Sequence, residues 1–286
     1  MDKKVVLITG CSSGFGREMV SAFLQGGWAV VATLRRAEDR KGLFSGERPQ
    51  DPGDLMLVDL DVTSQEQRSR VCAEIQHSRG RLDCLVNNAG YGLFGALEDL
   101  SEEQLRHQFE TNFWGAALMT RQFLPLLRKS GGRVVNVSSM VGFCAIPLTS
   151  AYSASKFALE GLTEALYYEL KPHGVQVALV EPGGFRTRFG DNVRWSQDGS
   201  ANGTAYAVQT AGMMRFRERL SAKEGSSPKT VAATVLKLAE VAKMPLRTRC
   251  GRDASASYLL KKLAPASLST RLFSSLYDRV LMRAGA

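Results

Sequence analysis

Short apolar segments alternate with longer amphipathic segments along most of the chain. The short segments are rich in β-branched residues, which is typical of strands buried on both faces of a parallel sheet. The longer segments repeat apolar residues three or four positions apart, as helices do. We predict strands at 5–9, 29–34, 55–59, 84–87, 133–138 and 176–181, with a weaker strand at 247–250.

Helices are predicted between these strands. Capping boxes, in which glutamine follows serine three positions later, begin helices after Ser64 and Ser101. Two long helices are predicted at 109–127 and 152–170. The alternation predicts an α/β protein with a doubly wound parallel sheet, a Rossmann fold of about seven strands with helices on both faces. Its ligand crevice would lie at the carboxyl ends of the strands.

Composition limits the class of protein. The 286 residues are enough for one large α/β domain, and no Pro/Gly/Ser-rich linker divides them, so we expect a single domain at 1–286. The five cysteines have no C-x-x-C spacing and the three histidines are scattered, which predicts reduced thiols and no metal site. No apolar stretch approaches the ~18 residues of a membrane span, and no signal-peptide pattern precedes the first strand. We therefore expect a cytoplasmic protein without an integral membrane segment.

The net charge of +9 raises the question of a nucleic-acid partner. The basic residues are dispersed and form no stripe with interleaved aromatics, so we expect no nucleic-acid binding. The C-terminal segment at about 255–286 mixes leucines with lysines and arginines. Such an amphipathic tail usually packs on its own domain or on a partner subunit, and weak peripheral membrane contact is the alternative.

A glycine-rich loop, Thr9-Gly10-Cys11-Ser12-Ser13-Gly14-Phe15-Gly16, joins the first strand to a helical pattern. Backbone N–H groups at the start of a helix attract an anion, and glycines let a pyrophosphate approach closely. Three glycines in a loop can also form an ordinary turn. Because this loop stands between a strand and a helix, it favours dinucleotide binding.

Tyr152 and Lys156 are four residues apart in a predicted helix, which places a phenol beside an ammonium group on one face. The ammonium charge favours the phenolate and lowers the pKa of the phenol towards the working pH, as general acid–base catalysis needs. Such pairs also occur on helices without a catalytic role. The glycine loop far upstream is the second observation that favours a catalytic role for Tyr152 and Lys156.

Further motifs lie where predicted strands end, and so at one edge of the sheet. Asn87-Asn88-Ala89-Gly90 follows the fourth strand, Ser138-Ser139 ends the fifth, and Pro182-Gly183 follows the sixth. With these motifs the chain closely resembles the short-chain dehydrogenase/reductase family over roughly residues 3–190. The glycine loop matches the T-G-x-x-x-G-x-G motif of that family, and the loop after the fourth strand matches its N-N-A-G motif. The residues that match its catalytic tetrad are Asn112, Ser139, Tyr152 and Lys156.

The resemblance implies a role for each member of the tetrad. Tyr152 would exchange a proton with the substrate oxygen while a nicotinamide carries the hydride, and Lys156 would lower the pKa of the phenol and hold the nicotinamide ribose. Ser139 would bind the same oxygen, and its neighbour Ser138 is the weaker candidate. Asn112, in the middle of a long helix, would hold a water that links Lys156 to solvent. Without the family, Asn112 would equally fit a helix kink.

The resemblance also implies a nicotinamide cofactor, and the end of the second strand bears on its type. Leu34 occupies the position where NAD-preferring relatives carry aspartate, and Arg35 follows in the position where NADP-preferring relatives carry a base. We predict NADP(H), with NAD(H) as the weaker alternative, although Arg35 and Arg36 could be ordinary surface charges. Asp61 would contact the adenine, with Asp59 as its rival. The predicted cofactor-binding residues are Gly10, Ser12, Ser13, Gly14, Phe15, Gly16, Arg35, Arg36, Asp61, Val62, Asn88, Ala89, Gly90, Tyr152, Lys156, Pro182, Gly183 and Thr187.

Within the family, the stretches 7–14, 32–35 and 154–161 look most like hydroxysteroid and retinol dehydrogenases. This resemblance implies a small-molecule alcohol or carbonyl substrate that is bulky and lipophilic. A lid at about 185–220 would close the pocket, and its aromatic residues and methionines fit an apolar substrate as well as they fit ordinary packing. These residues are Trp195, Tyr206, Met213, Met214 and Phe216. Reduction is the expected direction because NADP(H) pools are usually kept reduced.

Two other functions compete with the oxidoreductase. Ser153–Lys156 has the S-x-x-K form of penicillin-binding hydrolases, but the chain has no S-D-N or K-T-G partner motif. An NADP(H)-binding sensor without turnover would keep the fold, but it would not need a complete tetrad. The resemblance also implies a homodimer or homotetramer formed through the two long helices, although the C-terminal segment could cover that face in a monomer.

Overall fold

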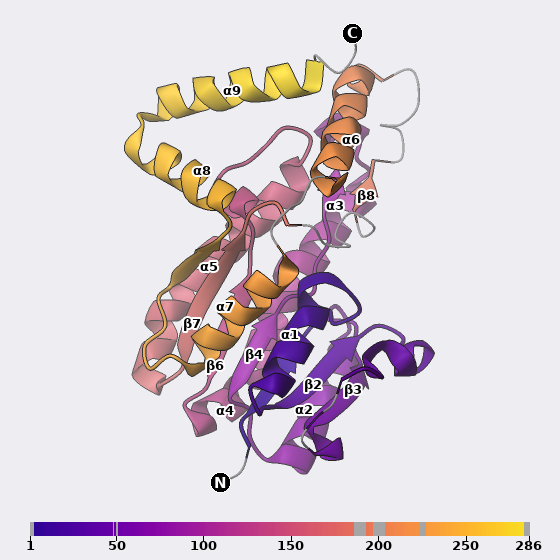
Figure 1. Cartoon of the computed structure of the whole chain (residues 1–286), viewed down its shortest axis with the longest axis vertical. Coiled ribbons are helices and arrows are strands. Elements are labelled where there is room, and N and C mark those ends of the chain that lie inside the picture. The colour runs from indigo at the N-terminus through magenta and orange to yellow at the C-terminus, as the bar shows by residue number, and fades with distance from the viewer. Residues whose placement is uncertain are drawn as a thin grey trace.

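Seven strands form one parallel sheet in the order β3-β2-β1-β4-β6-β7-β9 (Figure 1). The structure is a computed structural model that describes residues 3–47, 49, 51–185, 193–196, 204–222 and 227–282. The strands are β1 (Val5–Ile8), β2 (Ala29–Leu34), β3 (Leu55–Asp59), β4 (Cys84–Asn87), β6 (Arg133–Val137), β7 (Gln176–Pro182) and β9 (Arg247–Cys250). The predicted doubly wound α/β sheet is confirmed, and no predicted strand end is wrong by more than one residue.

Helices cover both faces of this sheet. They are α1 (Gly14–Gln25), α2 (Gln65–Arg79), α3 (Glu102–Phe109), α4 (Gly115–Ser130), α5 (Ser150–Leu170), α6 (Ala207–Ala222), α7 (Pro228–Glu240), α8 (Arg252–Leu263) and α9 (Ala266–Met282). α1 and α7 lie side by side on one face, and α2, α4 and α5 cover the other (Figure 1). Strand side chains alternate between two cores, so that Val6 and Ile8 face α1 and α7 while Val5 and Leu7 face α2 and α4.

The helix predicted at 109–127 begins differently from the prediction. α3 ends at Phe109, a π-helical turn spans Glu110–Trp114, and α4 follows from Gly115. The turn packs closely on the loop after β3, because a Cβ at Gly115 would lie 2.6 Å from Cγ2 of Val62. The apolar periodicity of a sequence does not reveal one wider turn within a helical run. The other long helix is confirmed, with its start at Ser150.

A second, smaller layer stands beyond the carboxyl edge of the sheet. β5 (Leu93–Phe94) and β8 (Arg194–Trp195) pair there in parallel, and α6 packs against α9. The predicted amphipathic C-terminal segment forms α8 and α9, and α9 crosses one end of the molecule (Figure 1). The exposed leucines of these two helices are Leu259 and Leu263 on α8 and Leu268, Leu272 and Leu276 on α9. Among the described residues, the helices are all too short or too polar to cross a membrane.

Candidate active site

The glycine loop after β1 is locked to the loop after β4. The hydroxyl of Thr9 accepts hydrogen bonds from the backbone N–H groups of Asn88 at 2.9 Å and Ala89 at 3.0 Å. The side-chain amide of Asn88 donates back to the carbonyl of Thr9 at 2.8 Å. Gly10 has a φ of +74°, and a Cβ there would lie 2.8 Å from Cα of Ala89. These contacts explain why glycine and threonine occur together in this motif.

The glycine loop leads into the N-terminus of α1, where an anion can bind. A Cβ at Gly16 would collide with the carbonyl oxygen of Gly10, so the helix starts directly against the loop. The side chain of the N-cap residue Ser13 makes no capping hydrogen bond, and the first turn contains no acidic residue. The backbone N–H groups of this turn are therefore available for a pyrophosphate. This geometry fits the cofactor inferred from the sequence.

Asn112 lies in the π-helical turn and is 1% exposed. Its amide oxygen accepts from the N–H of Tyr91 at 3.1 Å, and its nitrogen donates to the carbonyl of Tyr91 at 2.9 Å and to the hydroxyl of Ser155 at 3.3 Å. The Ser155 hydroxyl donates to the backbone carbonyl of Tyr152 at 2.7 Å. Asn112 thus connects the loop after β4 to α5 at the position of Tyr152. The water role implied by the family stays a prediction.

Tyr152 is buried beside Ser139. Burial raises the pKa of Tyr152 to about 12, although a hydrogen bond to Ser139 and the charge of Arg217 work in the opposite direction. The expectation that Lys156 would bring this pKa towards neutrality is therefore not met, because the desolvation of the phenolate dominates. The neighbouring Ser138 packs against Gly142, where a Cβ would lie 2.7 Å from Oγ of Ser138 and 3.1 Å from Cγ of Glu160. The choice of Ser139 over Ser138 stays a prediction, and the hydrogen bond between Ser139 and Tyr152 supports it.

Lys156 follows one turn after Tyr152 and is also buried. Its ammonium group donates to the carbonyl of Val137, at the end of β6, at 2.8 Å. Burial lowers the pKa of Lys156 to about 8, and the carboxylate of Glu160 opposes that shift. A Cβ at Gly90 would lie 3.0 Å from Oδ1 of Asn112 and 3.8 Å from Nζ of Lys156. The N-N-A-G loop therefore packs closely on Asn112 and Lys156.

A partly buried charge network joins α5, which carries Tyr152 and Lys156, to β7 and β9. Arg247 contacts Glu160 at 3.2 Å, Glu164 at 2.7 Å and Glu181 at 3.5 Å, and Arg249 lies 3.7 Å from Glu181. Burial and the charge of Glu160 raise the pKa of Glu181 to about 7, against the opposing charges of Arg249 and Arg247. Burial likewise raises the pKa of Glu160. Two carboxyl groups in one buried site cannot both ionise without cost.

The Glu181→Gln variant is expected to gain stability relative to the native protein as the pH rises from 5 to 8. A folded-state pKa of about 7, against 4.5 for the free group, means that folded Glu181 holds its proton more tightly than the unfolded chain does. Its contribution to stability is complete below pH 4.5 and is lost as the pH rises through about 7. Urea unfolding of both proteins at the two pH values measures the change, on the order of 1 kcal/mol. Parallel pH dependence in the two proteins would contradict it.

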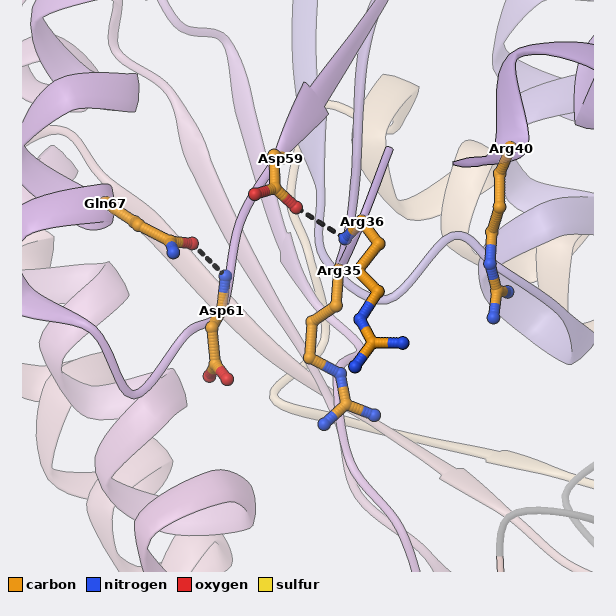
Figure 2. Close-up of a pocket in the computed structure, with 6 residues that line it drawn as sticks. All are labelled: Arg35, Arg36, Arg40, Asp59, Asp61 and Gln67. Atoms are coloured by element: carbon orange, nitrogen blue, oxygen red, sulfur yellow. Dashed lines mark hydrogen bonds between the residues drawn. The ribbon is translucent and has the colours of Figure 1, made fainter. Parts of the chain in front are cut away.

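A cavity of about 530 Å³ opens at the carboxyl ends of β2 and β3. Its lining residues are Arg35, Arg36, Arg40, Asp59, Asp61 and Gln67. The guanidinium groups of Arg35 and Arg36 lie close together and extend towards the same side as the carboxylate of Asp61, whereas Arg40 stands apart (Figure 2). Their positive charge fits the 2′-phosphate of NADP(H).

The two aspartates of this cavity accept hydrogen bonds from different parts of the chain. Asp59 accepts a hydrogen bond from the backbone N–H of Arg36 at 2.6 Å, which fixes the turn after β2 (Figure 2). Asp61 accepts from the N–H of Thr63 at 2.9 Å. Burial acts to raise the pKa of Asp61, but the hydrogen bonds from Thr63 and the charge of Arg35 outweigh it and lower the pKa. Asp61 therefore remains ionised and able to accept hydrogen bonds, as expected of the adenine-contacting residue.

The remaining predicted cofactor residues lie at the same edge or cannot be placed. Pro182 ends β7, and the N–H of Gly183 donates to the carbonyl of Cys250 at 2.9 Å. Phe15 packs edge-to-face on Phe185 with ring centroids 5.5 Å apart. Thr187, which would bind the nicotinamide carboxamide, lies outside the described residues.

Two cationic residues of the site were missed by the sequence interpretation. Arg40 reaches the cavity from a 3-10 helix (Glu38–Phe44), in which its φ of −130° marks a kink. Arg217 reaches the surroundings of Tyr152 from α6. Neither residue stands in a motif, and no local pattern would have identified them.

Known proteins resemble the chain along most of its length. A family model described as short chain dehydrogenase matches residues 4–198. A 3-ketodihydrosphingosine reductase from Bacteroides thetaiotaomicron is 36% identical over 252 residues, which are 88% of this chain and 89% of that protein. Retinol dehydrogenase 8 from Bos taurus is 34% identical over 273 residues, which are 92% of this chain and 86% of that protein.

Solved structures share the fold. A short-chain dehydrogenase from Streptomyces avermitilis has a TM-score of 0.80 at 36% identity, and the match covers 99% of this chain and 100% of that one. One from Burkholderia cenocepacia in complex with NADP has a TM-score of 0.73 at 26% identity, covering 95% and 98%. One from Burkholderia phymatum in complex with NAD has a TM-score of 0.77 at 25% identity, covering 91% and 93%. These neighbours support a nicotinamide cofactor without separating NADP from NAD.

Proposed function

The chain belongs to the short-chain dehydrogenase/reductase family, and we propose that it is an NADP(H)-dependent oxidoreductase that interconverts a carbonyl and an alcohol on a lipophilic substrate. The observation that carries this proposal is the buried phenol of Tyr152, which is hydrogen-bonded to Ser139. The glycine loop and the start of α1 lie at the same edge of the sheet. Lys156 stands one turn after Tyr152 on α5. At one edge of the sheet the protein thus has an acid, Tyr152, a hydrogen-bond donor for an oxyanion, Ser139, and the anion-binding N-terminus of α1.

In the reductive direction, Tyr152 donates a proton to the carbonyl oxygen of the substrate. A pKa of about 12 keeps the phenol protonated at neutral pH, which is the state that this step needs. Ser139 donates a hydrogen bond to the same oxygen and stabilises the charge that develops on it. When bound, the nicotinamide supplies the hydride that is transferred to the carbonyl carbon. The charge of Arg217, which opposes the rise in the pKa of Tyr152, favours the phenolate that remains after the proton has left, and we expect the ammonium group of Lys156 to act in the same sense.

The preference for NADP(H) is proposed from the cavity beyond β2. A 2′-phosphate needs cationic hydrogen-bond donors, and Arg35, Arg36 and Arg40 surround the cavity where the family binds the adenosine ribose. Leu34 ends β2 as a buried apolar residue, so the position where NAD-preferring relatives carry aspartate has no carboxylate. Asp59, which pairs with Leu34 across the sheet and lines the same cavity, accepts a hydrogen bond from the backbone N–H of Arg36.

The lipophilic substrate is proposed from the surroundings of Tyr152. The described residues that pack with it in one apolar cluster include Phe94, Val141, Met213 and Leu281. Retinol and 3-ketodihydrosphingosine, which appear in the names of two relatives, are themselves largely apolar molecules. α6, which lies within the predicted lid at about 185–220, and α9, which lies outside it, both contribute to this cluster.

The direct test is the oxidation of NADPH and of NADH with a panel of ketones and aldehydes, from small aliphatic compounds to steroids and retinoids. We expect turnover with NADPH, with higher kcat/KM for the larger apolar carbonyls. Tight NADPH binding without turnover of any member would instead favour the sensor. The sedimentation mass of the same preparation tests the homodimer or homotetramer expected through α4 and α5. Phe157 and Tyr168 on α5 are exposed, as is Trp114 in the π-helical turn before α4.

A further inference from the structure

α6 carries a cation into the apolar cluster around Tyr152. The guanidinium carbon of Arg217 lies 4.7 Å from the centroid of the Phe94 ring. That ring in turn lies 6.2 Å from the ring of Tyr152 at an interplanar angle of 30°. Met213 and Phe216, from the same helix, pack in the cluster as well. Arg217 therefore lies at the apolar cluster around Tyr152, where the proposed function places the substrate.

The Phe94 ring, on which Arg217 stacks, is held in place by its neighbours. The carbonyl of Phe94 accepts from the N–H of Ser196 at 2.8 Å, and the N–H of Gly95 donates to the carbonyl of Leu148 at 2.8 Å. The Phe94 ring also packs edge-to-face on Trp195 with centroids 5.6 Å apart. A side chain stacked on this ring has a defined position, and a defined position is what separates a binding residue from a mobile surface charge.

The charge of Arg217 has no carboxylate counter-ion among the residues that the structure describes. Burial lowers the pKa of its guanidinium, and the charge of Tyr152 opposes this shift. Stacking on a phenyl ring attracts a cation without neutralising it. A half-buried cation without a partner is costly in the protein alone and favourable once an anion arrives.

We propose that Arg217 is the anion subsite of the substrate pocket and that the substrate is an amphipathic carbonyl compound with a carboxylate group. This inference rests on the proposed function and adds the polar half of the substrate to it. The apolar body would lie against Phe94, Met213 and Phe216, while the fork of N–H donors on Arg217 binds the carboxylate. The carboxylate would then be held at a fixed distance from the carbonyl that reacts at Tyr152.

The first experiment measures binding and needs no turnover. Decanoate and decanol are titrated calorimetrically into the NADPH-loaded protein, because they share an apolar chain and differ in the carboxylate. We expect decanoate to bind about tenfold more tightly, as one charged hydrogen-bonded pair would give. The preference should disappear in Arg217→Met and persist in Arg217→Lys. Arg271→Met, which removes an exposed charge from α9, is the matched control and should retain the preference.

The second experiment compares medium-chain oxo-carboxylates with their methyl esters as substrates for NADPH oxidation. We expect the acids to have the lower KM in the native protein and in Arg271→Met, and the difference to vanish in Arg217→Met. Equal binding of decanoate and decanol, or a preference that survives Arg217→Met, would overturn the anion subsite. Absence of turnover with every carbonyl compound would count against the oxidoreductase, whereas the binding experiment still decides the role of Arg217.

Discussion

Replacement of Tyr152 by phenylalanine is expected to lower kcat for NADPH-dependent carbonyl reduction by a factor of about 10² to 10⁴. The phenylalanine ring keeps the contacts of the tyrosine ring, including the neighbouring Phe94, but it carries no proton. Ser139 would still bind the carbonyl oxygen without being able to supply the proton in place of the phenol. The affinity for NADPH should remain within about twofold, because the ring of residue 152 and the other predicted cofactor-binding residues stay in place.

Two comparisons make this result decisive. Tyr168→Phe removes a phenol that is 62% exposed on the same helix, and it should leave kcat unchanged. Calorimetric titration of Tyr152→Phe with NADPH should give the native affinity, which excludes a collapsed site. If kcat of Tyr152→Phe stayed within about threefold of the native value, another group would be the acid, and the assignment of the tetrad would be wrong.

The sheet and the cofactor loop were predictable because their causes are local in the sequence. A strand such as Val5–Ile8, buried on both faces, reads as an uninterrupted apolar run. Gly10 and Gly16 are required by backbone atoms that come within contact of them, so their spacing is a direct trace of the turn. Tyr152 and Lys156 are one turn apart on one helix, and that spacing needs no tertiary information.

Other features of the site depend on packing between distant segments. Arg217 meets Phe94 only because α6 folds over the carboxyl edge, and nothing in the sequence around either residue records this contact. The high pKa of Tyr152 reflects the degree of burial, and the sequence indicated only the opposing charge of Lys156. The π-helical turn at Asn112 is held by the backbone of Tyr91, far from it in sequence. Tertiary contacts of this kind override local patterns.

The double variant Arg35→Met and Arg36→Met is expected to weaken NADPH binding by about a hundredfold and NADH binding by no more than about threefold. Each guanidinium group that contacts a phosphate contributes charge-assisted hydrogen bonds, and NADH has no phosphate at this position. The fold should tolerate the change because both side chains are exposed. The backbone hydrogen bond from Arg36 to Asp59, at 2.6 Å, does not involve the side chain that is replaced.

Titration of NADPH and NADH by fluorescence, at low and high ionic strength, separates this role from an ordinary surface charge. In the native protein, added salt should weaken NADPH binding more than NADH binding, and this difference should shrink in the double variant. Arg128→Met, which removes an exposed charge at the end of α4, should leave both affinities unchanged. Equal losses for NADPH and NADH in the double variant would mean that the two arginines support the loop rather than the phosphate. Arg40, which stands apart from them in the cavity, would then be the remaining residue able to select NADP(H) (Figure 2).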